Sequence, residues 1–163
     1  MIAAAFREND AVPTNWTWIF QAKPGEWDLR SQLAEQPRAQ WKVATFAAEM
    51  KIGDTVYLWE SGPKAALLAR CRLTSKPVVQ PLRPELRAYV RHPKYLGEIR
   101  RAGLLVELVI EPELTRQELL EHPALAALAP IGGPTAARQG TNFSVPPQAA
   151  ELLDALVGSL RRR

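Results

Sequence analysis

The stretch Ile52-Gly53-Asp54-Thr55-Val56-Tyr57-Leu58-Trp59-Glu60-Ser61-Gly62 carries the clearest fold signal in the sequence. Residues 55–59 are mostly β-branched or aromatic, which favours a strand. The turn Ser61-Gly62-Pro63 follows, and residues 65–73 read as a second strand, so we expect the two to pair as a hairpin. Because side chains alternate along a strand, one face of the second strand is predicted to be buried, namely Leu67, Ala69, Cys71 and Leu73.

The residues before the hairpin predict a further strand and a short helix. Residues 16–20 are all aromatic or β-branched and indicate a strand, which Lys23-Pro24-Gly25 ends. Asp28 is suited to cap a short helix that stops before Pro37. Residues 40–44, which include Trp41, are too short for a packed helix and are predicted to form a loop, while residues 45–50 are expected to form one or two helical turns.

After the hairpin, the pattern predicts a mixed α+β architecture. A long proline-containing link, residues 75–103, precedes an apolar strand over residues 104–111, and loops of that length tend to be functional. Thr115 and Glu118 form a capping box that starts a short helix. Residues 147–160 predict a final helix that docks through one apolar stripe, made of Ala149, Leu152, Leu153, Leu156 and Leu160.

Length and composition favour one small domain without a transmembrane segment. The chain has 163 residues, 47% of them hydrophobic, which is enough for a single core. We assign residues 15–160 to this domain, 1–14 to a loose lead-in and 161–163 to a basic tail. One cysteine and two histidines predict neither a disulfide framework nor a metal cluster. No secretory signal or membrane span is recognisable, so a cytoplasmic location is expected.

Residues that could support catalysis form no recognisable constellation. The sequence has no glycine-rich phosphate loop and no nucleophile elbow, and neither histidine is spaced to pair with a nucleophile. The carboxylates are explained as helix surface and strand edge. We therefore predict a protein that is not an enzyme and uses no cofactor or metal.

Aromatic and basic residues point instead to nucleic-acid binding. Trp41 and Trp59 stand outside periodic core faces, where an indole suits stacking on a base, although an ordinary core position explains them as well. Between Arg70 and Arg101, nine lysines and arginines stand against two glutamates. They suit phosphate contacts or a merely solvated loop, because a net charge of +4 decides little. The candidate phosphate contacts are Arg83, Arg87, Arg91, Lys94 and Arg100.

Several motifs, in this order, resemble the EVE domain. They are residues 18–24 (WIFQAKP), 41–43 (WKV), 52–62 (IGDTVYLWESG) and 140–145 (GTNFSV). The resemblance covers residues 15–160. It implies a PUA-like fold, with a strongly bent mixed sheet or pseudo-barrel flanked by short helices and a C-terminal helix, similar to the YTH domains that bind N6-methyladenine in RNA. The alanine-rich start of residues 65–69 departs from the glycine-rich pattern usual in the family.

The same resemblance implies a pocket for a flipped-out modified base. Trp41 would be its wall, and its replacement by alanine is expected to change stability little. The other implied pocket residues are Lys42, Val43, Gln21, Ala22, Lys23, Trp59, Ser61 and Asn142. The expected partner is nucleic acid carrying modified cytosine or methyladenine, with DNA favoured over RNA, in a restriction or defence role beside a nuclease or helicase. A small-molecule regulator and an RNA-modification reader remain alternatives.

Overall fold

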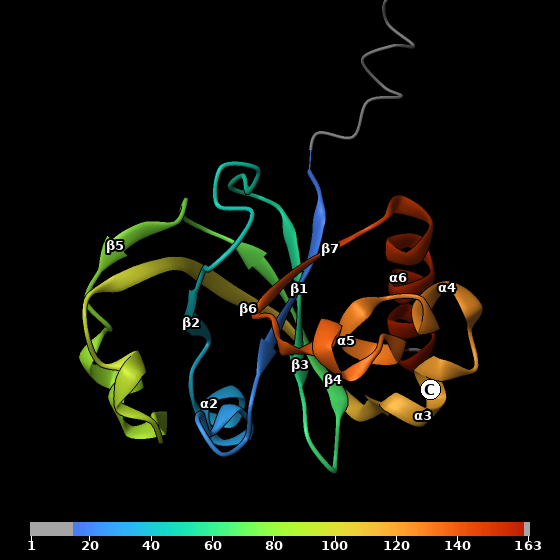
Figure 1. The fold of residues 1–163 in the computed structure, drawn as a ribbon, viewed down its shortest axis with the longest axis horizontal. Coiled ribbons are helices and arrows are strands. Elements are labelled where there is room, and N and C mark those ends of the chain that lie inside the picture. Colours follow the sequence, from blue (N-terminus) through green and yellow to red (C-terminus); the bar gives the residue numbers. More distant parts are fainter. Residues whose placement is uncertain (1–14, 162–163) are drawn as a thin grey trace, which may run out of the picture.

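A strongly curled, seven-stranded mixed sheet forms the centre of the molecule (Figure 1). The computed structural model describes residues 15–161, so the predicted lead-in and nearly all of the basic tail lie outside the described residues. The strands are β1 (Thr17–Ala22), β2 (Arg38–Lys42), β3 (Thr55–Glu60), β4 (Ala66–Leu73), β5 (Val78–Gln80), β6 (Ile99–Thr115) and β7 (Asn142–Val145). Their order is β2-β6-β4-β3-β1-β7, with β5 paired to β6, and only β1 and β3 run parallel.

Short helices cover both sides of this sheet. On one side lie α3, α4, α5 and the long α6, and toward the other lies α2 (Figure 1). The α-helices are α2 (Leu29–Glu35), α3 (Arg116–Leu120), α4 (Pro123–Ala126), α5 (Ala129–Gly132) and α6 (Pro147–Arg161), and the 3-10 helices are η1 (Pro84–Tyr89), η2 (Pro93–Tyr95) and η3 (Thr135–Gln139). None of the helices in the described part of the chain is both long and apolar enough to span a bilayer.

Two separate hydrophobic cores lie on the two faces of the sheet. Along β1, Trp18 and Phe20 enter the first core and Ile19 enters the second. In β3, Leu58 joins the first core and Trp59 joins the second. This division follows from the two-residue period of a strand. Neighbouring residues of one motif therefore pack into different cores, on opposite faces of the sheet.

The Gly53-Asp54 pair joins β1 to β3. Gly53 has a φ of +97°, a left-handed conformation that glycine adopts without a steric penalty. The fully buried Asp54 carboxylate accepts hydrogen bonds from the indole Nε1 of Trp18 at 2.8 Å, the Lys51 amide at 2.9 Å and the Trp16 amide at 3.0 Å. The sequence motif is thus a structural clamp.

Several predicted elements are confirmed. The β3–β4 hairpin forms as expected. Thr115 and Glu118 make both halves of the capping box at the start of α3. The apolar stripe of α6 packs into the second core, with Ala149 and Leu153 buried.

Three local predictions were wrong. Residues 40–42 belong to β2 rather than to a loop, because they pair with residues 101–103 of β6. The strand predicted over 104–111 extends from Ile99 to Thr115, as it pairs with β2, β4 and β5 in turn. A register shift between Leu67 and Ala69 breaks the expected single buried face of β4, so that Leu67 enters the second core and Ala69 the first.

Candidate functional site

Four aromatic side chains from separate segments meet on the face of the sheet that carries the first core. Trp41, in β2, lies 6.2 Å from Phe20 of β1 and 6.4 Å from Trp27, measured between ring centroids. Tyr95, at the end of η2, meets Trp27 edge-on at 5.5 Å with an interplanar angle of 84°. Tilted and edge-on contacts of this kind are favourable, so the cluster is stable without a ligand.

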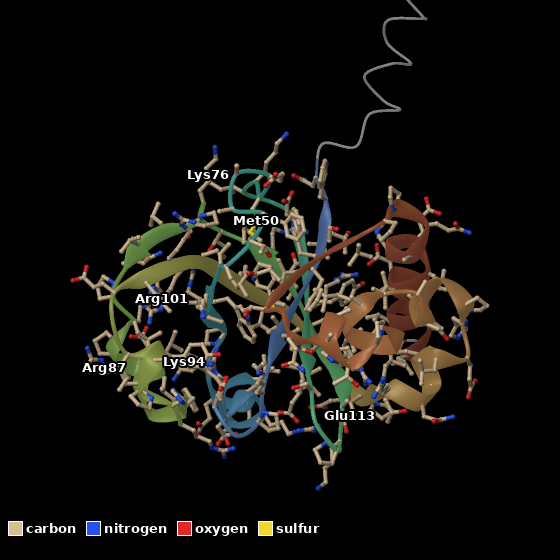
Figure 2. The ribbon with its side chains drawn as sticks, viewed as in Figure 1. Met50, Lys76, Arg87, Lys94, Arg101 and Glu113 are labelled. Atoms are coloured by element: carbon tan, nitrogen blue, oxygen red, sulfur yellow. The ribbon has the colours of Figure 1, made fainter. Side chains whose placement is uncertain are left out.

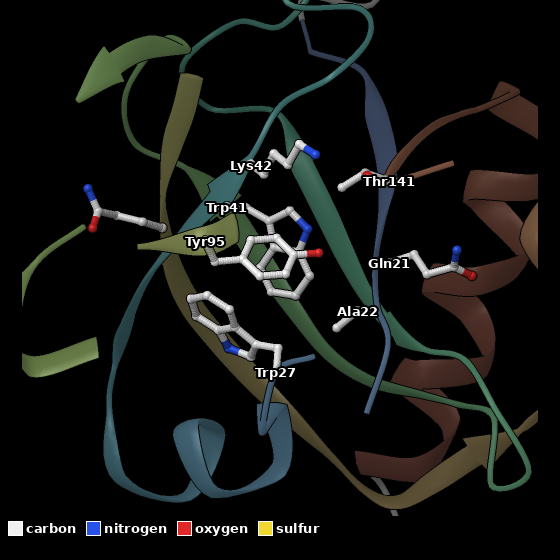
Figure 3. Close-up of a pocket in the computed structure, with 8 residues that line it drawn as sticks. Gln21, Ala22, Trp27, Trp41, Lys42, Tyr95 and Thr141 are labelled. Carbon is white, nitrogen blue, oxygen red and sulfur yellow. The ribbon is translucent and has the colours of Figure 1, made fainter. Parts of the chain in front are cut away.

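A small cavity adjoins this cluster. Its lining residues are Gln21, Ala22, Trp27, Gln40, Trp41, Lys42, Tyr95 and Thr141. The free volume is about 20 Å³, roughly the room of one water molecule and far less than a planar base needs. Figure 3 shows the Tyr95 ring beside Trp41 and Trp27, with its hydroxyl directed toward the β1 side of the cavity. The Tyr95 side chain is one of the walls that leave this free volume so small.

A latch made of Glu26, Lys94 and Tyr95 holds that ring. The Tyr95 hydroxyl donates to Glu26 Oε1 at 3.1 Å, and Lys94 Nζ lies 2.9 Å from Glu26 Oε2. Burial, and then the Glu26 charge, raise the pKa of Tyr95 to about 12. Burial acts to raise the pKa of the Glu26 carboxyl, but the hydrogen bonds from Lys94 and Tyr95 outweigh it and leave that pKa below its ordinary value. The Glu26 carboxyl is thus ionised at neutral pH, where it accepts the hydrogen bonds from Lys94 and Tyr95.

Arg101 holds the backbone around Tyr95 in place through hydrogen bonds. Its guanidinium, in a residue only 2% exposed, donates to the carbonyl oxygens of Gln80 and Gly97 at 2.6 and 2.8 Å, and also to that of Tyr95. Burial lowers the pKa of this guanidinium. Three bonds to carbonyls anchor the backbone around η2 to β6. The Tyr95 ring is held by its hydrogen bond to Glu26, by the Lys94 ammonium 5.2 Å from the ring centroid and by packing.

The structure brings four of the predicted pocket residues to this cavity, namely Gln21, Ala22, Trp41 and Lys42. The Gln21 amide faces away (Figure 3) and donates to the carbonyls of Arg138 and Gly140, each at 2.8 Å. Gln21 therefore contributes its backbone rather than a recognition group. Lys42 extends its side chain along the edge of the cavity beside Thr141 (Figure 3).

Trp59, Lys23 and Ser61 do not line this cavity, which corrects the prediction for each of them. Trp59 is 1% exposed and packs into the second core, on the opposite face of the sheet from Trp41. The reason is strand alternation, because Leu58, the neighbour of Trp59, belongs to the first core together with Trp41. Lys23 and Ser61 line a different cavity together with Trp59.

Val43 and Asn142 support the wall rather than forming it. The Val43 amide donates to the Arg100 carbonyl at 3.0 Å, and its side chain is buried in the first core. Asn142 Nδ2 donates to the Lys42 carbonyl at 3.1 Å, while its Oδ1 accepts from the Ala44 amide at 2.7 Å. The Lys42 carbonyl and the Val43 amide are therefore already engaged in hydrogen bonds.

Trp27, Gln40, Tyr95 and Thr141 are cavity residues that the sequence prediction missed. Trp27 follows the turn at Pro24-Gly25 and belongs to no periodic pattern. Tyr95 lies in the long link that was expected to be functional, but a single tyrosine in a loop gives no further signal. Gln40 turns its amide to the Arg83 segment, where its Oε1 accepts from the Arg83 amide at 2.7 Å.

The five predicted phosphate contacts fall into two groups. All five are exposed. Arg91 lies 3.2 Å from Asp28, and Lys94 is held in the latch. Within residues 15–161, Arg83, Arg87 and Arg100 form no ion pair, and Figure 2 shows Arg87 pointing outward from its segment. These three guanidiniums are therefore the predicted contacts that no described carboxylate neutralises.

Solved structures of other proteins share this fold. A protein from Pseudomonas putida superposes with a TM-score of 0.63 at 19% sequence identity, covering 86% of this chain and 99% of that chain. Human THYN1, in complex with DNA containing 5-methylcytosine, superposes with a TM-score of 0.60 at 10% identity over 88% of this chain and 98% of that chain. The YTH domain of Zygosaccharomyces rouxii MRB1, in complex with N6-methyladenosine RNA, gives a TM-score of 0.52 at 12% identity over 90% and 89%.

Sequence comparison adds no assignment, because no protein-family model and no curated protein matches the chain. The structural likeness confirms the expected α+β, PUA-like fold, with its curled mixed sheet, short helices and C-terminal helix.

Proposed function

We propose that the chain is a non-catalytic module of the EVE class that holds a modified nucleobase, flipped out of a nucleic-acid strand, against Trp41. The aromatic cluster of Phe20, Trp27, Trp41 and Tyr95 beside a cavity carries this proposal. Two proteins of the same fold are seen in complex with nucleic acid that carries a modified base, one with DNA and one with RNA, and this supports a nucleic-acid partner; DNA is the partner we propose. The proposed setting is modification-dependent defence, with a nuclease or helicase as partner.

In binding, the flipped-out base would take the place of the Tyr95 ring beside Trp41. Flipping a base costs a few kcal/mol, and stacking on an aromatic side chain returns about 1–3 kcal/mol per base. The entering base would displace the Tyr95 ring, which lines the cavity beside Trp27 and Trp41 in the structure. A methyl group on the base adds about 0.8 kcal/mol of burial, so discrimination by the methyl alone is modest and hydrogen bonds to the base edge must supply the rest.

A panel of duplexes tests the proposal directly. The duplexes carry 5-methylcytosine, 5-hydroxymethylcytosine or N6-methyladenine, with unmodified and RNA counterparts, and binding is followed by fluorescence anisotropy. We expect one modified DNA to bind more tightly than its unmodified match, and no strand to be cut with any divalent metal. Equal affinity for all the duplexes would contradict recognition of a modified base and favour a small-molecule regulator. Tighter binding of a modified RNA would favour an RNA-modification reader. Metal-dependent cleavage would show that the protein is an enzyme.

Opening the latch should strengthen base binding. Glu26→Gln removes the charge that pairs with Lys94 and weakens the hold on the Tyr95 hydroxyl. If the open state is a minor population, the apparent affinity for the modified duplex should rise about two- to tenfold. Glu35→Gln is the matched control, because Glu35 accepts from the Tyr89 hydroxyl at 2.7 Å away from the cavity. Unchanged or weaker binding by Glu26→Gln would show that Tyr95 is not a gate.

The free cations should set the salt dependence. Replacing Arg83, Arg87 and Arg100 by glutamine should weaken modified and unmodified strands about equally and reduce the slope of log affinity against log salt by about 0.9 per lost contact. Arg91→Gln serves as the comparison, because Arg91 is already paired with Asp28. An unchanged slope in the triple variant would remove this segment from the nucleic-acid interface.

A further inference from the structure

A second cavity lies on the face of the sheet that carries the second core, opposite the face of Trp41. It has about 260 Å³ of free volume, and Trp59, which belongs to the second core, is among its lining residues. The end of β1 separates the two cavities, since Gln21 lines both and Lys23 lines only the second. This cavity is therefore a distinct site and not a part of the base pocket.

Three cations line this cavity without a carboxylate. Lys23, Arg116 and Arg138 are lining residues, and none of the lining residues is acidic. Among the residues that the structure describes, no carboxylate oxygen lies within 4.0 Å of any of the three. Elsewhere on the molecule arginines such as Arg30, Arg72 and Arg91 do have acidic partners. Within residues 15–161 no ion pair therefore neutralises these cations, and of the three only Lys23 is recorded to interact electrostatically with a carboxylate, that of Glu26.

The two guanidiniums also retain free donors. Arg116 Nε donates to the Ile131 carbonyl at 2.6 Å, and this bond leaves its terminal NH₂ groups available. Arg138 Nη2 donates to Thr135 Oγ1 at 3.3 Å, while its buried Nε has no partner among the described residues. A buried N–H without an acceptor is costly unless something else accepts its proton. Burial, and then the charge of Arg138, lower the pKa of Arg116, as expected for two close cations.

From this arrangement we infer that the cavity binds a phosphate group, held by the guanidiniums of Arg116 and Arg138 with Lys23 at its side. Paired guanidinium donors match the oxygens of a phosphate in geometry and charge. Ser61 also lines the cavity, but its hydroxyl donates to the Ala22 carbonyl at 3.3 Å, so the guanidiniums and Lys23 are the groups that would hold the phosphate. The phosphate is either a diester of a bound strand or a free phosphomonoester, and both present the same anionic oxygens.

A titration with inorganic phosphate tests the site without any base. The amides of a ¹⁵N-labelled protein are followed by NMR at constant ionic strength, with chloride as the balancing anion. We expect saturable shifts around Ser61, Arg116 and residues 135–139. In Arg138→Gln the affinity should fall by about tenfold or more, because charge-assisted bonds are lost. In Arg38→Gln, which removes an exposed arginine at the start of β2, it should not change.

Non-saturable shifts, or equal affinity in Arg138→Gln and the unmodified protein, would overturn the inference. Should Arg138→Gln disturb the fold, Lys23→Gln gives the same test in the same direction, because Lys23 has neither a hydrogen bond nor an ion pair from its side chain within residues 15–161. The titration contains no nucleobase, so the phosphate site can stand even if base binding at Trp41 fails.

A second set of ligands identifies the source of the phosphate. One is thymidine monophosphate, and the other is an unmodified oligonucleotide without terminal phosphates. Tighter binding of the oligonucleotide, lost in Arg138→Gln, would assign the site to the backbone of a bound strand. Tighter binding of the nucleotide would assign it to a free phosphomonoester. If neither shifts the residues around Arg138, the inference is overturned.

Discussion

Asp54→Ala is expected to lower the free energy of unfolding by roughly 3–5 kcal/mol, as the substitution removes three hydrogen bonds to one charged group. Its carboxylate, 0% exposed, accepts from the amides of Trp16 and Lys51 and from the indole of Trp18. The Trp18 indole is itself fully buried, so without Asp54 its N–H would have no acceptor in place. Urea denaturation followed by tryptophan fluorescence measures the change.

Two comparison variants separate this effect from a general loss of charge. Asp54→Asn keeps an acceptor oxygen of the same shape and should restore part of the lost stability. Glu151→Ala removes an exposed carboxylate from α6 and should change the free energy of unfolding by no more than about 0.5 kcal/mol. A cost of Asp54→Ala as small as that of Glu151→Ala would refute the role of Asp54 as a clamp between β1 and β3.

Local sequence patterns predicted the elements whose signals are self-contained. The β3–β4 hairpin has β-branched and aromatic runs around a Gly-Pro turn, and α3 begins at a complete capping box. The α6 stripe repeats at helical spacing and packs as predicted. In each case the residues that decide the structure are near neighbours in sequence, so the physics that forms the element is local.

Elements that depend on distant partners were harder to predict. Residues 38–42 contain arginine, glutamine and lysine, which give no strand pattern, and they form β2 only because β6 offers its free edge. The bulge in β4 likewise arises from pairing with β6 over residues about 40 positions away. Pairing of this kind cannot be read from the propensities of the strand itself.

The candidate site was predicted in part for the same reason. Trp41, Lys42 and Ala22 were identified through a family resemblance, whereas Trp27 and Tyr95 enter the cluster from turns whose positions depend on the whole fold. The wrong placement of Trp59 has a simpler cause. A motif that reads L-W offers two adjacent side chains, and strand geometry sends them to opposite faces. A predicted strand does not by itself show which of its side chains point to which face of the sheet, so it cannot place Trp59.

Because Trp41 and Trp59 lie on opposite faces of the sheet, substitution of Trp59 is the control for substitution of Trp41 in the experiment on base binding. Trp41 is 5% and Trp59 1% exposed, so the expectation that Trp41→Ala changes stability little does not hold. Truncation of either buried indole to alanine should cost about 3–5 kcal/mol of stability. Leucine at either position keeps the site apolar and limits this loss, while it removes the stacking face.

Trp41→Leu should therefore weaken binding of the preferred modified duplex by about 1–3 kcal/mol, the value of one stacked base, while Trp59→Leu should leave that affinity unchanged. Both variants should unfold at lower urea than the unmodified protein, and binding is measured by fluorescence anisotropy at a temperature where both are folded. The common loss of stability controls for nonspecific damage to the core. Equal loss of affinity in the two variants would mean that binding depends only on an intact fold. Unchanged affinity in Trp41→Leu would place the base elsewhere on the molecule.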